Sequence, residues 1–163
     1  MSAHRYAVRV YYEDTDAGGV VYHANYLRFA ERARTEALRD IGVPHAEMAA
    51  LHDLFFMVRR IKVDYLAPAR LDDLLIVATV PLAVQGASVE LRQTVLRAGD
   101  DHLLVRIDLQ LVCVRLADQR PGRLPPRWRA ALRHMVDSDG SAPVGAQWEH
   151  DRPAGSDVSE RKG

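Results

Sequence analysis

The pattern of apolar and polar residues changes period early in the chain. Apolar side chains alternate with mostly polar ones over residues 6–13, which predicts a β-strand. After a loop at 14–21, apolar residues recur at steps of three and four over 26–41, which predicts one long helix. Asn25 stands where an N-cap is expected, and Gly42 is a suitable helix end.

Strand patterns dominate the chain after this helix. Residues 57–66 alternate, and three further apolar segments at 74–84, 88–97 and 103–114 are joined by short turns, which is typical of an antiparallel meander. A short helix is expected over 127–135. The order β-α-β-β-β-β predicts an α+β fold, with a long helix against a curved five-stranded antiparallel sheet.

Five residues indicate how these elements pack. Ala30, Ala33 and Ala37 lie on the apolar face of the helix, so the sheet can approach it closely. Pro81 stands late in its strand, which predicts a bulge or an edge there. Cys113 falls on the apolar face of the last strand, and we expect a core thiol rather than a nucleophile.

The composition changes near residue 136. Residues 137–163 are rich in Gly, Ser, Ala, Pro and charge, and Trp148 is their only large apolar residue. Such a segment buries too little surface to offset its ordering entropy, so we expect a flexible C-terminal tail after one domain at 1–136. The chain has 22 basic and 22 acidic residues. Three of the basic residues and six of the acidic residues lie in this tail. The zero net charge therefore combines a mildly basic domain with an acidic tail.

Several functional classes are excluded at this point. A nucleic-acid binder normally carries a basic surplus, which the whole chain of 163 residues lacks. The longest apolar runs, at 48–51 and 54–58, are too short to span a bilayer. The N-terminus has no export signal, and a single cysteine allows neither an internal disulfide nor a cysteine-based zinc site. We expect a cytoplasmic protein without membrane insertion or a nucleic-acid partner.

The segment at 11–26 carries the residues best suited to chemistry. Glu13, Asp14 and Asp16, a pair of glycines and His23 stand between the first strand and the long helix. The start of a helix offers unpaired N–H groups and the positive end of its dipole, which suit a developing oxyanion. A carboxylate at Asp16 can reach the same reacting carbon, an arrangement that favours acyl transfer.

Structural interpretations of the same residues stay open. Asp14 and Asp16 in a glycine-containing loop can be turn residues that bind their own backbone. His23 can be a group that caps the helix or faces solvent. A metal site from Glu13, Asp16 and His23 has no repeated ligand spacing to support it, so no metal site is predicted.

A resemblance to a known family favours the catalytic interpretation. Residues 8–26 read VRVYYEDTDAGGVVYHANY, and further matching segments lie at 31–36, 63–73 and 112–114. They resemble hotdog-fold acyl-CoA thioesterases of the 4-hydroxybenzoyl-CoA thioesterase type, above all the branch associated with the tol–pal system. The similarity extends over residues 6–132.

This resemblance implies a hotdog fold, in which the sheet wraps around the long helix, and an acyl-CoA thioesterase without a cofactor. It implies that Asp16 is the catalytic carboxylate, with Asp14 as a structural neighbour. The backbone N–H of His23 would polarise the thioester carbonyl, its imidazole could assist, and Tyr22 would contact the substrate. Hotdog domains form homodimers, often then homotetramers, with active sites at the subunit junction.

The phosphates of coenzyme A require cations, and two groups qualify. The first group consists of Arg59, Arg60 and Lys62. Strand alternation places Arg60 and Lys62 on one face of the sheet and Arg59 on the other. The other is the stretch 115–133, which holds six arginines and one aspartate. Solvated strand charges or ion pairs at the rim of a dimer are the structural alternative for the first group.

Three functions therefore compete. The first is hydrolysis of acyl-CoA or acyl-carrier-protein thioesters, with Asp16 as nucleophile or general base. The second is a non-catalytic hotdog scaffold, linked to the cell envelope, that binds an acyl group or a protein. The third, a dehydratase or hydratase, is disfavoured because the later strands offer no second motif. A scaffold has no need of Asp16 beside a helix start, which favours the first.

Overall fold

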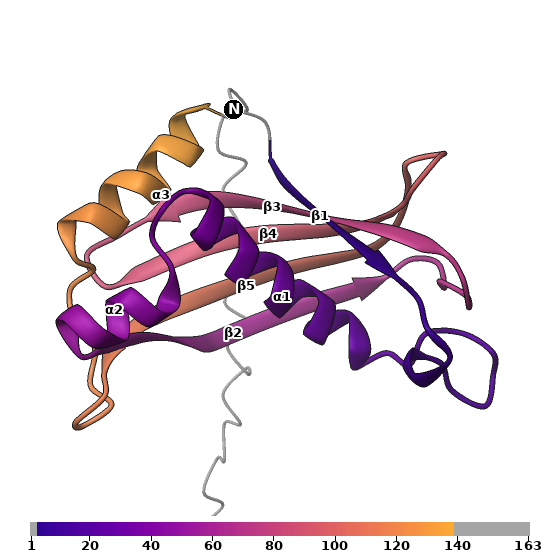
Figure 1. Cartoon of the computed structure of the whole chain (residues 1–163), viewed down its shortest axis with the longest axis horizontal. Helices are drawn as coiled ribbons and strands as arrows, with labels where there is room; N and C mark the ends of the chain where they lie inside the picture. Colours follow the sequence, from indigo (N-terminus) through magenta and orange to yellow (C-terminus); the bar gives the residue numbers. More distant parts are fainter. Residues whose placement is uncertain (1–2, 139–163) are drawn as a thin grey trace, which may run out of the picture.

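The computed structural model describes residues 3–138 (Figure 1). In chain order its elements are β1 (His4–Arg9), a 3₁₀ turn η1 (Tyr12–Asp14), α1 (Asn25–Asp40), α2 (His45–His52), β2 (Leu54–Tyr65), β3 (Leu74–Val84), β4 (Ser88–Arg97), β5 (His102–Arg115) and α3 (Pro126–Ser138).

The five strands form one antiparallel sheet in the order β1-β3-β4-β5-β2, so β1 and β2 are its edges. Helix α1 lies along one face of this curved sheet, and α3 lies near one end (Figure 1). The predicted α+β hotdog architecture is therefore confirmed. Helix α2 was not predicted, because its short segment carries apolar residues on every side rather than on one stripe.

The ends of the first strand and the long helix differ from the prediction. Strand β1 ends at Arg9 because Tyr12–Asp14 turns into a 3₁₀ helix. Asn25 is the first residue of α1 rather than its N-cap, and its side-chain amide donates to the carbonyl of Asp14 at 2.9 Å. At the other end, Gly42 adopts a φ of +78°, so the predicted helix end is confirmed.

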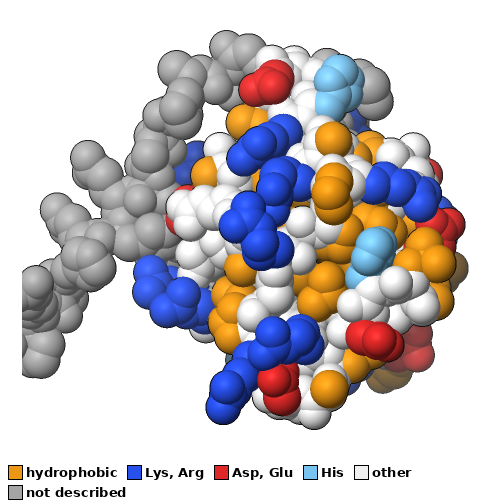
Figure 2. All heavy atoms as spheres, turned by 90° about the vertical axis from the view of Figure 1, so that its left-hand side faces the viewer, with side chains coloured by type: hydrophobic (Ala, Val, Ile, Leu, Met, Phe, Trp, Pro, Cys, Tyr) orange, Lys and Arg blue, Asp and Glu red, His pale blue; other side chains and the backbone are white. Residues whose placement is uncertain are grey.

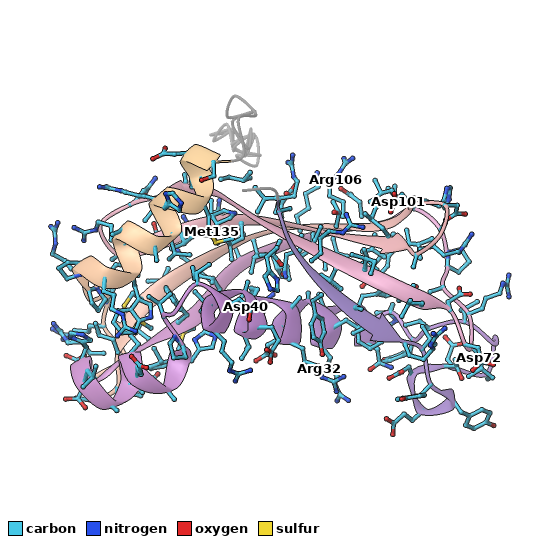
Figure 3. The ribbon with its side chains drawn as sticks, turned by 45° about the horizontal axis from the view of Figure 1, so that its top comes forward. Arg32, Asp40, Asp72, Asp101, Arg106 and Met135 are labelled. Carbon is cyan, nitrogen blue, oxygen red and sulfur yellow. The ribbon has the colours of Figure 1, made fainter. Side chains whose placement is uncertain are left out.

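The apolar face of α1 is buried against the sheet. Ala30 and Ala33 have no exposed surface, and they belong to one core cluster with Val77, Val95 and Ile107 of the sheet. Polar residues of α1 such as Arg32 lie on its opposite side and point away from the sheet (Figure 3). Since alanine is the smallest side chain on this face, the helix backbone comes close to the strands.

A buried glutamine joins α1 to the sheet by hydrogen bonds. Gln93 of β4 is fully buried, and its Nε2 donates to the carbonyl of Ala30 and to Oγ1 of Thr79, both at 2.9 Å. Its Oε1 accepts a bond from the Arg34 guanidinium at 2.8 Å. Burial lowers the pKa of Arg34 from its ordinary value. Because buried amides are costly unless paired, this network specifies one position for the helix.

Two expectations about the strands are confirmed. Cys113 is fully buried, and burial raises the pKa of its thiol to about 11, as expected of a core thiol that is not a nucleophile. The pairing register of β3 and β4 shifts between Pro81 and Ala83, which is the bulge that Pro81 predicted. A second shift occurs in β2 between Val58 and Arg60, where the alternation predicted no irregularity.

The terminal helix α3 buries Trp128 and Leu132 and contacts β3. It continues to Ser138, two residues past the domain boundary expected at 136. The tail beyond it, 139–163, lies outside the described residues, so its flexibility stays a prediction. Within residues 3–138, no helix combines the length and apolarity needed to cross a membrane.

The close contact of α1 with the sheet can be tested by enlarging one alanine. Ala33→Leu should destabilise the fold by about 1–3 kcal/mol, because a fully buried position has no room for the added carbons. Ala50→Leu makes the same change at an exposed position of α2 and should alter stability by less than about 0.5 kcal/mol. Urea unfolding measures both, and equal effects would show that α1 is not confined at Ala33.

Candidate active site

A tight loop positions Asp16 between β1 and α1. The amide of Asp16 donates to the carbonyl of Val20 at 2.9 Å, and the amide of Gly19 donates to the carbonyl of Asp16 at 3.0 Å. Gly19 has a φ of +73°, which L side chains rarely adopt. A bridge between Val20 and Arg70 attaches this loop to the segment that follows β2.

Asp14 connects the same loop to the start of α1. Its carbonyl accepts bonds from the amide of Tyr22 and the side chain of Asn25, both at 2.9 Å. Its carboxylate accepts the amide of Tyr11 at 2.8 Å. Asp14 therefore fixes local backbone geometry, as the turn interpretation and the resemblance both expected.

The Asp16 carboxylate is bound on one side only. Oδ1 accepts the amide of Gly18 at 2.8 Å, so the turn interpretation holds for this oxygen. A side chain at Gly18 would bring its Cβ to 3.1 Å from Oδ1, which explains why glycine fits there. Oδ2 has no hydrogen-bond partner among residues 3–138, and the side chain is exposed. One carboxylate oxygen is thus oriented while the other is available to a ligand.

The turn before α1 presents two backbone donors. The amide of Asn25 donates to the carbonyl of Tyr22 at 2.9 Å, which makes residues 22–25 a helical turn. The amides of His23 and Ala24 have no partner in the part of the chain that is described. They lie at the positive end of the α1 dipole, where an anionic oxygen is stabilised.

Asp16 and His23 line one open cleft of about 350 Å³. We call it the Asp16–His23 cleft; its other lining residues are Val20, Val21, Tyr26, Tyr65, Leu66, Ala67 and Pro68. Its wall is mostly apolar, with the carboxylate and the helix start as polar features. The two residues expected to be catalytic are therefore brought together.

Two tyrosines of this cleft were not assigned a role from the sequence. The hydroxyl of Tyr65 donates to the carbonyl of His23 at 2.9 Å, and the hydroxyl of Tyr26 accepts the amide of Ala69 at 3.0 Å. The two rings meet edge to face with centroids 5.9 Å apart. Burial raises the pKa of both phenols, so both hydroxyls keep their protons near neutral pH. Tyr65 lies in the segment 63–73, which resembles the family. Its contact with His23 could not be predicted from the sequence, because the two residues are 42 positions apart.

Tyr22, predicted to contact substrate, does not line the cleft. It is 45% exposed, and its ring centroid lies 4.5 Å from that of His23. Tyr22 is therefore near His23 at the surface, and its contact with substrate stays a prediction.

The three cations of β2 do not line the cleft either. Arg60 and Lys62 stand opposite Gln110 and Asp108, whereas Tyr65 stands opposite Val105. Directly paired residues share a face, so Arg60 and Lys62 lie on the face away from the cleft. Arg59 occupies the bulge, where strict alternation no longer assigns a face. Their role toward coenzyme A is not tested by this geometry.

Among residues 3–138, no group of three or more His, Cys, Asp or Glu side chains is arranged to hold a metal ion, and Glu13 does not line the cleft.

Comparison with known proteins identifies the family of this chain. The sequence profile described as the thioesterase-like superfamily matches residues 10–132. The acyl-CoA thioesterase YbgC of Haemophilus influenzae is 42% identical over 130 residues, covering 80% of this chain and 94% of that protein. The acyl-CoA thioester hydrolase YbgC of an Escherichia coli strain is 46% identical over 121 residues, covering 74% and 89%.

A solved structure shares both sequence and fold. The probable thioesterase from Bartonella henselae is 37% identical, with a TM-score of 0.71, and the match covers 76% of this chain and 100% of that one. The family expected from the sequence is therefore confirmed: this chain belongs to the thioesterase-like superfamily, and its homologues include acyl-CoA thioesterases.

Proposed function

We propose that this protein hydrolyses acyl-CoA thioesters to a free acid and coenzyme A in the Asp16–His23 cleft. The observation that carries the proposal is a carboxylate with one unpaired oxygen in the same cleft as a helix start with unpaired amides. The YbgC homologues, named for this activity, support the substrate class. An acyl-carrier-protein thioester presents the same reacting group and is the alternative substrate.

The arrangement suits a thioester because thiolate is a good leaving group. Oδ2 of Asp16 either attacks the carbonyl carbon or removes a proton from a water that attacks it. In the first route the C–S bond breaks to leave a mixed anhydride, which water then hydrolyses. In the second, water supplies the new C–O bond, and the proton taken by Asp16 passes to the departing thiolate.

The start of α1 stabilises the charge on the carbonyl oxygen in both routes. Donors aimed where negative charge develops lower the barrier, and His23, whose amide is unpaired among residues 3–138, lines the cleft. The imidazole of His23 is near the rings of Tyr22 and Tyr65, with centroids 4.5 and 6.3 Å away, and His23 lines the cleft, so its imidazole could assist.

We further propose that the active enzyme is a homodimer through β2. This edge strand is 12 residues long and exposes Met57, Val58 and Ile61 by 39–43%. A long edge strand offers unpaired backbone groups, which are a template for pairing with another strand. A two-fold axis through the middle of β2 makes the paired strands antiparallel, so the end of one lies beside the beginning of the other. A tetramer requires a second contact between such dimers.

This dimer gives the arginines of 115–133 a route to the substrate. Arg115 pairs with Leu54 at the beginning of β2, at the end of the sheet opposite the loop that holds Asp16 (Figure 1). Lys and Arg side chains gather at this end of the molecule (Figure 2). Antiparallel pairing carries this end of one subunit toward the cleft of the other, where coenzyme A phosphates need cations.

The carboxylate is tested by Asp16→Asn, which removes the nucleophile or base but keeps the size of the side chain. We expect kcat with acyl-CoA to fall by about 10²–10⁴-fold with the fold intact. Asp40→Asn changes an exposed carboxylate at the far end of α1 and should leave kcat unchanged. Thiol release across a panel of acyl-CoAs is the measurement.

Full activity of Asp16→Asn would contradict the mechanism. A wild-type protein that binds acyl groups but hydrolyses none of the panel would instead favour the scaffold interpretation.

The dimer is tested by Ile61→Lys, which places a charge in the proposed contact. We expect sedimentation velocity to show monomers, because burying an unpaired lysine is costly. Leu71→Lys alters a residue of similar exposure outside β2 and should leave the assembly intact. Wild-type protein that sediments as a monomer would refute the dimer directly.

The two cation groups are separated by substrates that differ only in the nucleotide. One double variant combines Arg120→Ala with Arg123→Ala, and the other combines Arg60→Ala with Lys62→Ala. If the residues replaced in a variant bind phosphate, that variant should have a KM for acyl-CoA raised by about 3- to 10-fold. KM for the matching acyl-pantetheine, which lacks those phosphates, should not change. Unchanged KM for acyl-CoA excludes the pair tested.

A further inference from the structure

We propose that Tyr65 is a positioning residue of the oxyanion site, which holds the turn at the start of α1 so that its amides bind the carbonyl oxygen of the substrate. The inference rests on the proposed thioesterase activity and adds to it a residue from another element. Its basis is the hydrogen bond from the Tyr65 hydroxyl to the carbonyl of His23 at 2.9 Å, between residues 42 positions apart.

The bond acts on a rigid unit. The carbonyl of His23 and the amide of Ala24 belong to one planar trans peptide, so fixing the oxygen also fixes the direction of the N–H at the opposite side. The preceding peptide is held in the same way, because the carbonyl of Tyr22 accepts the amide of Asn25 at 2.9 Å. Both carbonyls of the turn are thus occupied, while both corresponding amides, of His23 and Ala24, are unpaired among residues 3–138.

The bond also makes the peptide a better donor. A hydrogen bond accepted by a carbonyl polarises the amide, and bonds in such a chain strengthen one another. The Tyr65 hydroxyl is a donor at neutral pH, because the ordinary pKa of a phenol is about 10 and partial burial raises the pKa of Tyr65 further. The bond acts directly on the N–H of Ala24, and it acts on the N–H of His23, the residue that lines the cleft, by holding the turn that contains both. A negative charge that develops on the thioester oxygen is then stabilised with the help of a group that need not touch the substrate oxygen.

Folding does not account for this bond. The side chain of Tyr65 is 48% exposed, and the bond itself is exposed, so water could satisfy both groups without it. The ring is placed by edge-to-face contacts with Tyr26 and His23, with centroids 5.9 and 6.3 Å away. Phenylalanine would keep these ring contacts and lose only the hydroxyl.

Tyr65→Phe therefore tests the role of the hydroxyl. We expect kcat to fall by about 10-fold, as for loss of one hydrogen bond felt in the transition state, with KM changed less than about 2-fold. The melting temperature should match that of the wild type. Tyr6→Phe removes a hydroxyl from β1, outside the cleft, and should change neither kcat nor KM.

A spectroscopic readout separates positioning from a merely structural role. The probe is a non-hydrolysable acyl-CoA analogue in which CH₂ replaces sulfur and the ketone carbonyl carries ¹³C. Binding to the wild type should move the carbonyl stretch to lower wavenumber, and Tyr65→Phe should reduce this shift while the analogue still binds. An equal shift in both proteins, or no change in kcat, would overturn the inference.

The same probe distinguishes failure of the two proposals. A wild type that shifts the carbonyl band but hydrolyses no thioester, with a smaller shift in Tyr65→Phe, would refute the proposed function and support the role of Tyr65 in carbonyl binding. A wild type that hydrolyses acyl-CoA while Tyr65→Phe shows full activity and the full shift would support the function and refute the role.

Discussion

The position of α1 on the sheet is the constraint on which the rest of the structure depends. Its alanines let the helix backbone approach the strands, and Gln93 bonds the carbonyl of Ala30 directly. Apolar packing alone tolerates some sliding, whereas a buried amide that must be paired does not. Since the helix is rigid, fixing it near Ala30 also fixes its start at Asn25, which is about 1.4 turns away. The proposed oxyanion donors therefore depend on a contact in the core as well as on the hydrogen bonds of the turn that contains them.

The carboxylate reaches this turn through backbone bonds. The carbonyl of Asp14 accepts two donors from the start of α1, and the amide of Val21 donates to the carbonyl of Ala69 at 2.9 Å. The loop with Asp16 is thereby tied to the helix on one side and to the segment after β2 on the other. A loop with few apolar residues is held in place because the helix start and the segment after β2 both share its hydrogen bonds, as the proposed role of Asp16 requires.

The sequence predicted what depends on periodicity and missed what depends on contacts between distant segments. The long helix, the meander, the bulge at Pro81 and the buried Cys113 follow from local patterns. Asn25 was assigned as a cap because a polar residue before a helix usually caps it, but the carbonyl of Asp14 is a better-placed partner. The local sequence pattern indicates only that Tyr65 is one more residue of an alternating strand. Asp16 and His23 were found through the resemblance, since their spacing alone equally allowed turn residues.

The location of Tyr65 connects the cleft to assembly. It ends the same strand whose middle exposes Met57, Val58 and Ile61, the residues proposed to meet a second subunit. An unpaired edge strand twists and frays more readily than a paired one, and any such movement would be passed through the Tyr65 hydroxyl to the turn at His23. Pairing of β2 would hold the strand and, with it, the oxyanion donors. The proposed dimer would then do more than add binding residues from a second copy, because it would stabilise the geometry that each subunit already contains.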